Sequence, residues 1–256
     1  MEQKFTVLMS AVNEDEALKE TVRIILETCS HQDLAEIFIF VGLNATASCL
    51  SALEEVKESS DDVPVNIFHQ TYKGPGANWN EFFELFKGTH IVTVAADGEL
   101  DPYQVSEFIE RSKEKPEYII IGSRKLGRNG FKDYYFFKKM LNMCAGAFLR
   151  VLYQTDRTEF TQPFFSGPVG VFSAIRWEEQ FHPVFMEMIL KPMRLGVKAE
   201  EIPTEWKKRQ NGKPNRGAFY FLPYLKTAVR IRTMKKNRIL KQGREIPEKY
   251  TADKKG

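Results

Sequence analysis

Short apolar runs alternate with stretches of helical periodicity along the first half of the chain. Five of these runs have the composition of β-strands: Phe5–Met9, Ile37–Val41, Val65–Phe68, His90–Ala95 and Tyr118–Gly122. Between them, apolar residues recur every three or four positions, which is the spacing of one buried helix face. Because strands that alternate with helices are typical of βαβ units, the pattern predicts an α/β fold with a mostly parallel sheet flanked by helices.

Polar residues mark where several of these predicted helices begin. Asn13, with Glu16 three positions later, has the spacing of a capping box directly after the first strand. Asp101-Pro102 combines an N-cap with a proline at the first helical position. Aromatic residues at helical spacing then predict the buried face of a helix that starts just after Gly74-Pro75-Gly76: Trp79, Phe82, Phe83 and Phe86.

The pattern changes in the second half of the chain. It predicts a long helix, a short strand, a further helix and a last strand, at Asp133–Tyr153, Gly167–Phe172, Phe185–Leu195 and Val197–Ile202. A terminal helix starts at about Phe219, and we expect the charged tail to be disordered past Lys241. We therefore expect one domain over residues 1–215, followed by a basic amphipathic helix and tail over 216–256.

Composition limits the classes of protein and the cellular compartments that fit this chain. With 256 residues and 43% hydrophobic content, the chain can bury a full core. Its three cysteines lack any CxxC or Cys/His ligand spacing, so neither a disulfide framework nor a zinc site is indicated. The sequence shows no apolar stretch long enough for a signal peptide or a membrane span. We expect a cytoplasmic protein, soluble or peripheral on the inner face of a membrane.

Charge is distributed unevenly along the chain. Residues 191–256 carry 19 Lys and Arg against 6 Asp and Glu, whereas residues 1–190 carry 18 against 28. A basic last quarter favours an anionic partner, such as a membrane surface, a phosphorylated acceptor or nucleic acid. We expect no nucleic acid partner, because the sequence contains no nucleic-acid recognition motif. A solvated basic tail without a partner is the alternative.

The acidic turn after the fourth predicted strand is the strongest chemical signal. The strand delivers Asp97 and Glu99 to the carboxyl edge of the sheet, where ligands bind in open α/β folds. Two carboxylates in one tight turn can reach one hard cation, Mg²⁺ or Mn²⁺, and that cation would bridge a substrate diphosphate. An ordinary acidic turn between a strand and a helix is the alternative.

Other segments at strand ends extend this signal into a resemblance. Ser10-Ala11-Val12-Asn13-Glu14 follows the first strand, Lys73-Gly74-Pro75-Gly76 precedes a helix, and Gly122-Ser123-Arg124 follows the fifth strand. With the acidic turn, they resemble the family 2 glycosyltransferases over roughly residues 4–215. Among these, the chain is similar to polyprenyl-phosphate sugar transferases of the dolichyl-phosphate mannose synthase type. The resemblance implies a GT-A, Rossmann-like fold and a nucleoside-diphosphate sugar as the donor substrate.

The resemblance also implies a role for each matching residue of the donor site. Ala11, Asn13 and Glu14 would line the pocket for base and ribose. Asp97 would be the principal metal ligand, and Glu99 would restore the carboxylate that the family's Asp-x-Asp motif loses here at Ala95. The remaining donor contacts would come from the glycine-rich segment, namely from Lys73, Gly74 and Gly76, and they would approach the diphosphate.

Three further residues would serve the transfer step. Glu187 matches the family's helix-borne carboxylate that faces the acceptor and is the candidate general base, although a surface glutamate is the alternative. Arg124, and Arg209 in the basic segment Arg209–Lys213, would stabilise charge on the leaving diphosphate. An arginine that is merely solvated is the alternative for Arg209.

Two other segments depart from the family pattern. The segment that usually reads Asp-Asp-Gly-Ser is Val41-Gly42-Leu43-Asn44, and the one that reads Asp-x-x-x-Gly-Phe-Arg is Pro163–Val169. A catalytically degenerate relative that keeps the fold is therefore the alternative to an active enzyme.

Taken together, the residues and the resemblance predict a metal-dependent inverting transfer of a sugar to a polyprenyl phosphate or a glycan. A phosphate acceptor needs no base, whereas a hydroxyl acceptor would need Glu187. The basic terminal helix would lie on an anionic bilayer with an apolar face made by Phe221, Tyr224, Leu225, Ala228 and Ile231.

Overall fold

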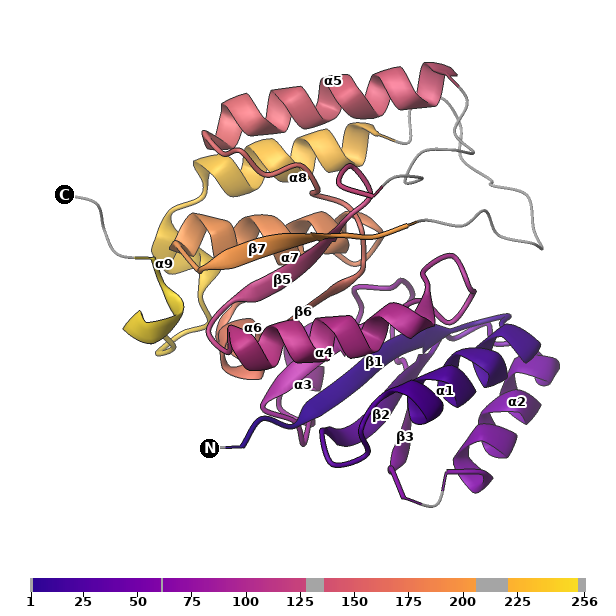
Figure 1. The fold of residues 1–256 in the computed structure, drawn as a ribbon. Coiled ribbons are helices and arrows are strands. Elements are labelled where there is room, and N and C mark those ends of the chain that lie inside the picture. The colour runs from indigo at the N-terminus through magenta and orange to yellow at the C-terminus, as the bar shows by residue number, and fades with distance from the viewer. Residues whose placement is uncertain (1, 61, 128–135, 206–220, 253–256) are drawn as a thin grey trace.

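A seven-stranded sheet forms the centre of the computed structural model, which describes residues 2–60, 62–127, 136–205 and 221–252 (Figure 1). The strand order is β3-β2-β1-β4-β6-β5-β7. The strands are β1 Phe5–Ala11, β2 Leu34–Val41, β3 Val65–His69, β4 His90–Thr93, β5 Ile119–Ser123, β6 Phe165–Pro168 and β7 Ala199–Pro203. Neighbouring strands pair in parallel, except that β6 runs antiparallel to both β4 and β5. The α/β fold with a mostly parallel sheet is thus confirmed.

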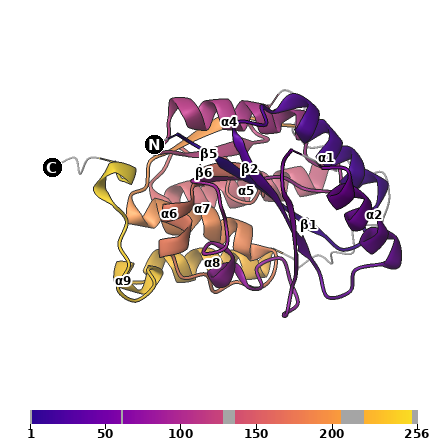
Figure 2. The same cartoon turned by 90° about the horizontal axis from the view of Figure 1, so that it is seen from below.

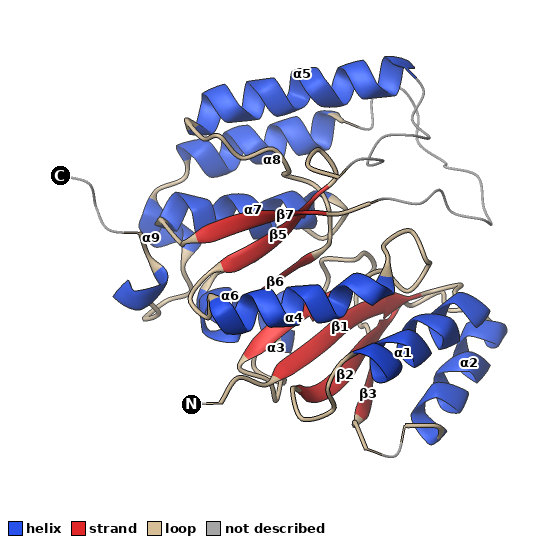
Figure 3. Cartoon of the chain, viewed as in Figure 1, coloured by secondary structure: helices blue, strands red, loops and turns tan. Residues whose placement is uncertain are grey.

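Helices cover both faces of this sheet (Figure 3). The α-helices are α1 Glu16–Thr28, α2 Ala47–Glu58, α3 Trp79–Phe82, α4 Val105–Glu114, α5 Phe136–Tyr153, α6 Val169–Ala174, α7 Pro183–Leu195, α8 Leu222–Thr233 and α9 Lys236–Ile239. Two short 3₁₀ helices are η1 Pro102–Gln104 and η2 Glu248–Tyr250. Helices α1, α2 and α4 pack on one face, while α3, α6, α7 and α8 share the core on the other face.

The near-continuous apolar runs follow from burial on both faces. In β2, the side chains of Ile37, Ile39 and Val41 enter the core beneath α1 and α2. The alternate side chains, Phe38 and Phe40, enter the core on the α3 and α7 side. Because successive strand residues point to opposite faces, a strand covered on both sides needs apolar residues at nearly every position. This is why simple apolar runs located the strands of the first half of the chain to within a few residues.

Aromatic spacing after residue 76 predicted a helix longer than the one observed. Helix α3 covers only Trp79–Phe82, yet the rings still pack into the core, with Phe82 stacked 3.9 Å from Phe40. The chain must then reach β4, and the amide of Lys87 donates to the buried carboxylate of Glu36 on the way. Packing against the sheet, and not helical length, therefore set the aromatic pattern.

The strand expected at Gly167–Phe172 lies at Phe165–Pro168 instead, so the prediction was misplaced towards the C-terminus. Strand β6 ends at Pro168, and helix α6 begins at Val169. Proline has no amide hydrogen to extend the ladder, and its φ of −65° suits the position just before a helix.

The tail past Lys241 is ordered up to Ala252, so the expectation of disorder there is wrong for residues 241–252. The amide of Lys198 donates to the carbonyl of Tyr250 at 2.8 Å, and the Arg244 guanidinium lies 3.2 Å from the Glu84 carboxylate. This backbone hydrogen bond and this ion pair connect the tail to earlier segments, and charge content alone did not reveal them.

Helix α8 shares the core of the sheet domain. Ala228 and Ile231 are fully buried, and α8 packs alongside α7, as Figure 2 shows from below. Among the described residues, no helix combines the length and apolarity that a membrane crossing needs. The terminal helix is therefore tied to the sheet through its buried side, while its opposite side faces outward.

Replacing Ile231 with alanine should lower the free energy of unfolding by about 2–4 kcal/mol, because the change opens a cavity between α8 and α7. Val229→Ala, on the exposed side of the same helix, should change it by less than about 0.5 kcal/mol. Urea unfolding of the full chain measures both values. Equal effects of the two substitutions would show that α8 does not share the core.

Candidate active site

The loops that follow the parallel strands meet at one edge of the sheet. Strand β1 lies between β2 and β4, with Leu8 opposite Thr93, so the loops after β1 and β4 are neighbours. These loops carry Ala11–Glu14 and Asp97–Glu99, and the loop after β5 carries Arg124. This carboxyl edge is where open α/β sheets bind ligands. The adjacent loops after β1 and β4 both lie at this edge.

The loop after β1 is shaped by its own carboxylate. Glu14 accepts hydrogen bonds from the amides of Val12 and Asn13 at 2.7 and 3.0 Å. Asp15, and not Asn13, caps α1 by accepting from the amide of Glu16, so the predicted capping box is wrong. Asn13 is exposed beside buried Ala11, which leaves its side chain available to a ligand over the first strand.

A glycine holds the loops after β1 and β2 close together. The amide of Gly42 donates to the carbonyl of Ala11 at 2.9 Å. A Cβ at Gly42 would lie 2.8 Å from Cγ2 of Val12. A side chain at position 42 would therefore require the exposed side chain of Val12 to shift.

The acidic turn after β4 is tight and half-buried. The Asp97 carboxylate accepts a hydrogen bond from the amide of Glu99 at 3.0 Å, and Gly98 between them has a φ of 72°. That left-handed conformation is open to glycine at little cost, and it turns the chain so that two carboxylates belong to one turn. Ala95, two residues earlier, offers no side-chain oxygen.

These donors fit a hard divalent cation. Within the described parts of the chain, no three His, Cys, Asp or Glu side chains cluster as a metal cage. Magnesium is usually bound by only one or two carboxylates, with substrate phosphates and water completing its shell. Asp97 and Glu99 match that arrangement, and the hydrogen bond within the turn fixes one of the two side chains.

The glycine-rich segment after β3 packs against the protein itself. A Cβ at Gly74 would lie 2.3 Å from the carbonyl oxygen of Gln180, and one at Gly76 would lie 2.0 Å from that of Glu179. The amide of Gly76 also donates to the Gln180 carbonyl at 2.8 Å. Contact with residues 179–180 thus requires these glycines, whereas Lys73 is exposed and remains the candidate for a phosphate contact.

Arg124 forms a buried ion pair that the sequence did not indicate. Its guanidinium donates to both carboxylate oxygens of Glu159, at 2.8 and 2.7 Å, and to the Thr161 hydroxyl at 2.8 Å. Burial raises the pKa of Glu159, but the charge and hydrogen bonds of Arg124 outweigh it, together with those of Thr161, and hold the pKa at about 2. Arg124 therefore shares its charge with Glu159 at the strand end.

Glu201 fixes the same loop from β7. Its carboxylate accepts from the amides of Thr158 and Glu159 at 2.9 and 2.7 Å. Nothing in the sequence singles out residues 158–161, because a short segment with one glutamate resembles an ordinary solvated loop. Only the pairing with Arg124 and Glu201 reveals that this loop borders the site.

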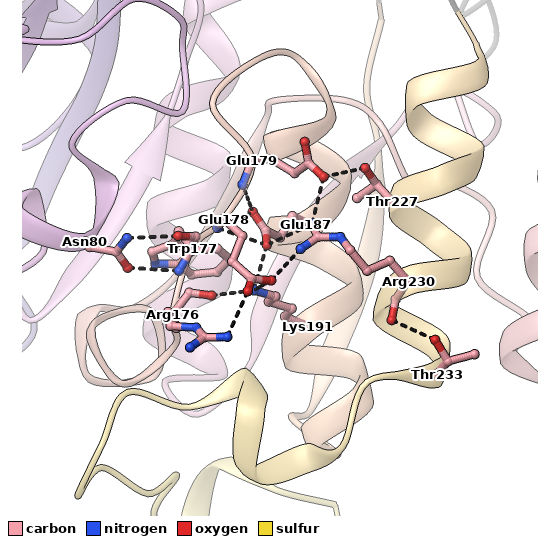
Figure 4. Close-up of polar contacts among 10 residues, drawn as sticks. All are labelled: Asn80, Arg176, Trp177, Glu178, Glu179, Glu187, Lys191, Thr227, Arg230 and Thr233. Carbon is pink, nitrogen blue, oxygen red and sulfur yellow. Dashed lines mark hydrogen bonds and ion pairs between the residues drawn. The ribbon is translucent and has the colours of Figure 1, made fainter.

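Glu187 is enclosed within the protein, contrary to the expectation that it faces an acceptor (Figure 4). Neither Glu187 nor Lys191 is exposed, and the Lys191 ammonium lies 2.6 Å from the Glu187 carboxylate. The amides of Glu178 and Glu179 donate to the same carboxylate at 3.1 and 2.9 Å. In this structure, Glu187 therefore orients the backbone of residues 178–179.

This buried pair connects several elements, as Figure 4 shows. Arg230 of α8 donates to Glu178 and Glu179 at 2.5 and 2.7 Å. On the other side, Asn80 exchanges hydrogen bonds of 2.8 and 2.9 Å with the backbone of Trp177. The network thus holds α7, α8 and the segment against which the glycine-rich loop packs. Arg209 lies outside the described residues.

Comparison with known proteins identifies the family to which this chain belongs. The model of a family described as glycosyl transferase family 2 matches residues 6–178. The chain belongs to that family, and it is a glycosyltransferase. The similarity to dolichyl-phosphate mannose synthase remains a prediction.

Solved structures share the fold. Glucosyl-3-phosphoglycerate synthase from Mycobacterium tuberculosis, in complex with Mn²⁺, UDP and phosphoglyceric acid, has a TM-score of 0.69 at 10% identity, covering 91% of this chain and 80% of that one. The same enzyme with Mg²⁺ and UDP gives a TM-score of 0.66 at 10% identity, covering 91% and 80%. At this identity the likeness concerns the fold alone, and it confirms the GT-A fold predicted from the sequence.

Glu159→Gln should weaken the fold in a pH-dependent way. Because the folded pKa of Glu159 lies below the ordinary 4.5, its ionised form stabilises the protein above that value, and this contribution disappears as pH falls towards about 2. We expect wild type and variant to differ by about 3 kcal/mol in unfolding free energy at neutral pH, and progressively less below the ordinary pKa. Urea unfolding across this range measures the difference. The exposed Glu54→Gln serves as control, and a pH-independent gap would contradict the ion-pair account.

Proposed function

We propose that this glycosyltransferase moves a sugar from a nucleoside-diphosphate sugar to the phosphate of a polyprenyl phosphate, with Mg²⁺ or Mn²⁺ held at Asp97 and Glu99. The observation that carries the proposal is the acidic turn at the carboxyl edge, directly beside the loop after β1. The M. tuberculosis synthase has been solved with Mn²⁺, UDP-glucose and phosphoglyceric acid, which supports a cation and a nucleotide-sugar donor for this fold.

Each part of the donor has a candidate contact at this edge. The base and ribose would lie over Ala11, beside Asn13 and Glu14, and the diphosphate would extend towards Asp97 and Glu99. When bound there, the cation supplies positive charge to the leaving diphosphate. Lys73 and Arg124 would add to that charge from the loops after β3 and β5. Arg124 does so from a fixed position, because Glu159 holds its guanidinium.

In the transfer step, an acceptor oxygen attacks the anomeric carbon opposite the diphosphate. One carbon–oxygen bond forms to the acceptor, the bond to the diphosphate breaks, and the nucleoside diphosphate departs with the electron pair. Positioning of the two substrates in line contributes much of the acceleration in such reactions. Inversion at the anomeric carbon follows from this single displacement.

The environment of Glu187 favours a phosphate acceptor. A hydroxyl must lose a proton as it attacks, and a positioned base typically contributes ~10²–10⁴-fold to such a step. Glu187 was the candidate base, but its carboxylate is enclosed and already bound to Lys191 and two amides. A phosphate oxygen is already anionic, so it needs no base.

Asp97→Asn should abolish Mn²⁺-dependent binding of the donor and leave the melting temperature unchanged, because a turn carboxylate lies outside the core. Titration calorimetry with UDP- and GDP-sugars, with and without Mn²⁺, measures the effect. Asp62→Asn, a remote exposed aspartate, is the matched control. Metal-dependent binding that survives in Asp97→Asn would remove this residue from the site.

Transfer of labelled sugar to a polyprenyl phosphate in detergent should exceed transfer to soluble glycans by at least about tenfold, since the phosphate acceptor needs no proton removal. Thin-layer chromatography of the extracted lipid measures the product. Robust transfer to a soluble glycan alone would contradict the acceptor assignment. Donor binding without transfer to either acceptor would instead favour a catalytically degenerate binding protein, which the loss at Ala95 keeps as the second candidate.

A further inference from the structure

Helices α5 and α8 each expose a stripe of large apolar side chains. On α5, the exposed fractions are 43% for Met140, 61% for Met143, 42% for Phe148 and 79% for Val151. These positions lie three to five residues apart, on the side opposite the buried Gly146 and Leu149. A stripe of this kind is unusual for a surface that meets only water.

Helix α8 presents a second stripe of the same kind. Leu222, Leu225 and Val229 are 48%, 39% and 42% exposed, at the spacing of one helix face. The opposite face carries Ala228 and Ile231, which are fully buried. The apolar face that the sequence assigned to this helix was therefore partly wrong, since two of its five members belong to the core.

The two helices are held next to each other. The Tyr153 hydroxyl donates to the carbonyl of Ala228, and Nε of Arg232 donates to the carbonyl of Leu152, each at 2.8 Å. Figure 1 shows α5 as the outermost helix, with α8 beside it. The two helices that carry the stripes are thus neighbours.

Both helices are basic and contain no acidic residue in their sequences. The 18 residues of α5 and the 12 of α8 include six Lys and Arg and no Asp or Glu, in a chain that has 34 acidic residues. Arg150 and Lys226 are exposed beside the stripes, and Lys235, Lys236 and Arg238 follow α8 at the surface. Positive charge around an apolar stripe is the composition of a helix that lies in the interface of an anionic membrane.

We infer that α5 and α8 together form a membrane-binding face whose partner is an anionic lipid bilayer. The apolar stripes would enter the boundary between headgroups and acyl chains, and the basic residues would contact the phosphate groups. A second copy of the chain fits this face less well, because a two-fold contact would bring the same positive charges against each other. The inference stands apart from the donor site, and a lipid-borne acceptor would give it a purpose.

The full-length protein should float with vesicles of phosphatidylcholine and phosphatidylglycerol, and not with vesicles of phosphatidylcholine alone. The double variant Met143→Asp/Val151→Asp should lower the partition coefficient on anionic vesicles at least roughly tenfold, because it places charge where apolar side chains enter the lipid. Leu50→Asp, on α2 at the opposite face of the sheet, is the matched control and should bind as wild type does.

A charge reversal provides a second test that does not alter the apolar stripes. Lys226→Glu should also lower binding to anionic vesicles roughly tenfold, whereas Lys57→Glu on α2 should have little effect. Equal flotation of wild type and both α5/α8 variants would overturn the inference. A lipid-independent dimer that the double variant dissociates, measured by analytical ultracentrifugation, would overturn it in favour of a second copy of the chain.

Donor binding without lipid separates this inference from the proposed function. Variants that lose vesicle binding should keep Mn²⁺-dependent affinity for the sugar nucleotide, since the α5/α8 face lies apart from the acidic turn. Loss of donor binding in Asp97→Asn with normal flotation would show that the membrane face and the donor site are independent.

Discussion

The pairing of β1 with β2 on one side and β4 on the other is the constraint on which the site depends. Parallel ladders align the carboxyl ends of these strands, so that Ala11, Val41 and Thr93 lie along one edge. The loop after β1 and the acidic turn after β4 thereby become neighbours on one surface. The hydrogen bond from Gly42 to Ala11 closes that surface on the β2 side. A register slip of one residue would turn the buried side chains to the wrong face and separate the loops.

Two ion pairs then fix segments of the second half of the chain. Arg124 with Glu159 secures the loop beside β5, and Glu187 with Lys191 secures the segment against which the glycine-rich loop packs. A buried pair is costly to break because the remaining charge has no partner, by about 3–5 kcal/mol. Such pairs therefore fix positions more than they add net stability. Arg230 extends the second network into α8, so the terminal helix and the glycine-rich loop are linked through residues 178–180.

The structure keeps the proposed donor site apart from the proposed membrane-binding face. The proposed donor site lies at the carboxyl edge, where Asp97 and Glu99 are half-buried and the Asp97 carboxylate is held by the amide of Glu99. The outward sides of α5 and α8 carry apolar and basic side chains that serve no purpose in the core. Because α8 is fixed through Ile231 and Arg230, a membrane that binds its outer side would hold the whole sheet in one orientation.

The sequence by itself determined the class of fold, the strands of the first half of the chain and the family. Burial on both sides of the sheet requires apolar residues at successive positions, so these strands can be recognised in the sequence alone. Asp97, Glu99 and Arg124 could be placed at strand ends for the same reason. Tertiary structure alone decided that Glu187 is enclosed with Lys191, that Arg124 pairs with Glu159, and that Ala228 and Ile231 face inward. Each of these depends on contacts between residues distant in the chain or on which helix face meets the core, and local periodicity carries no information about the partner.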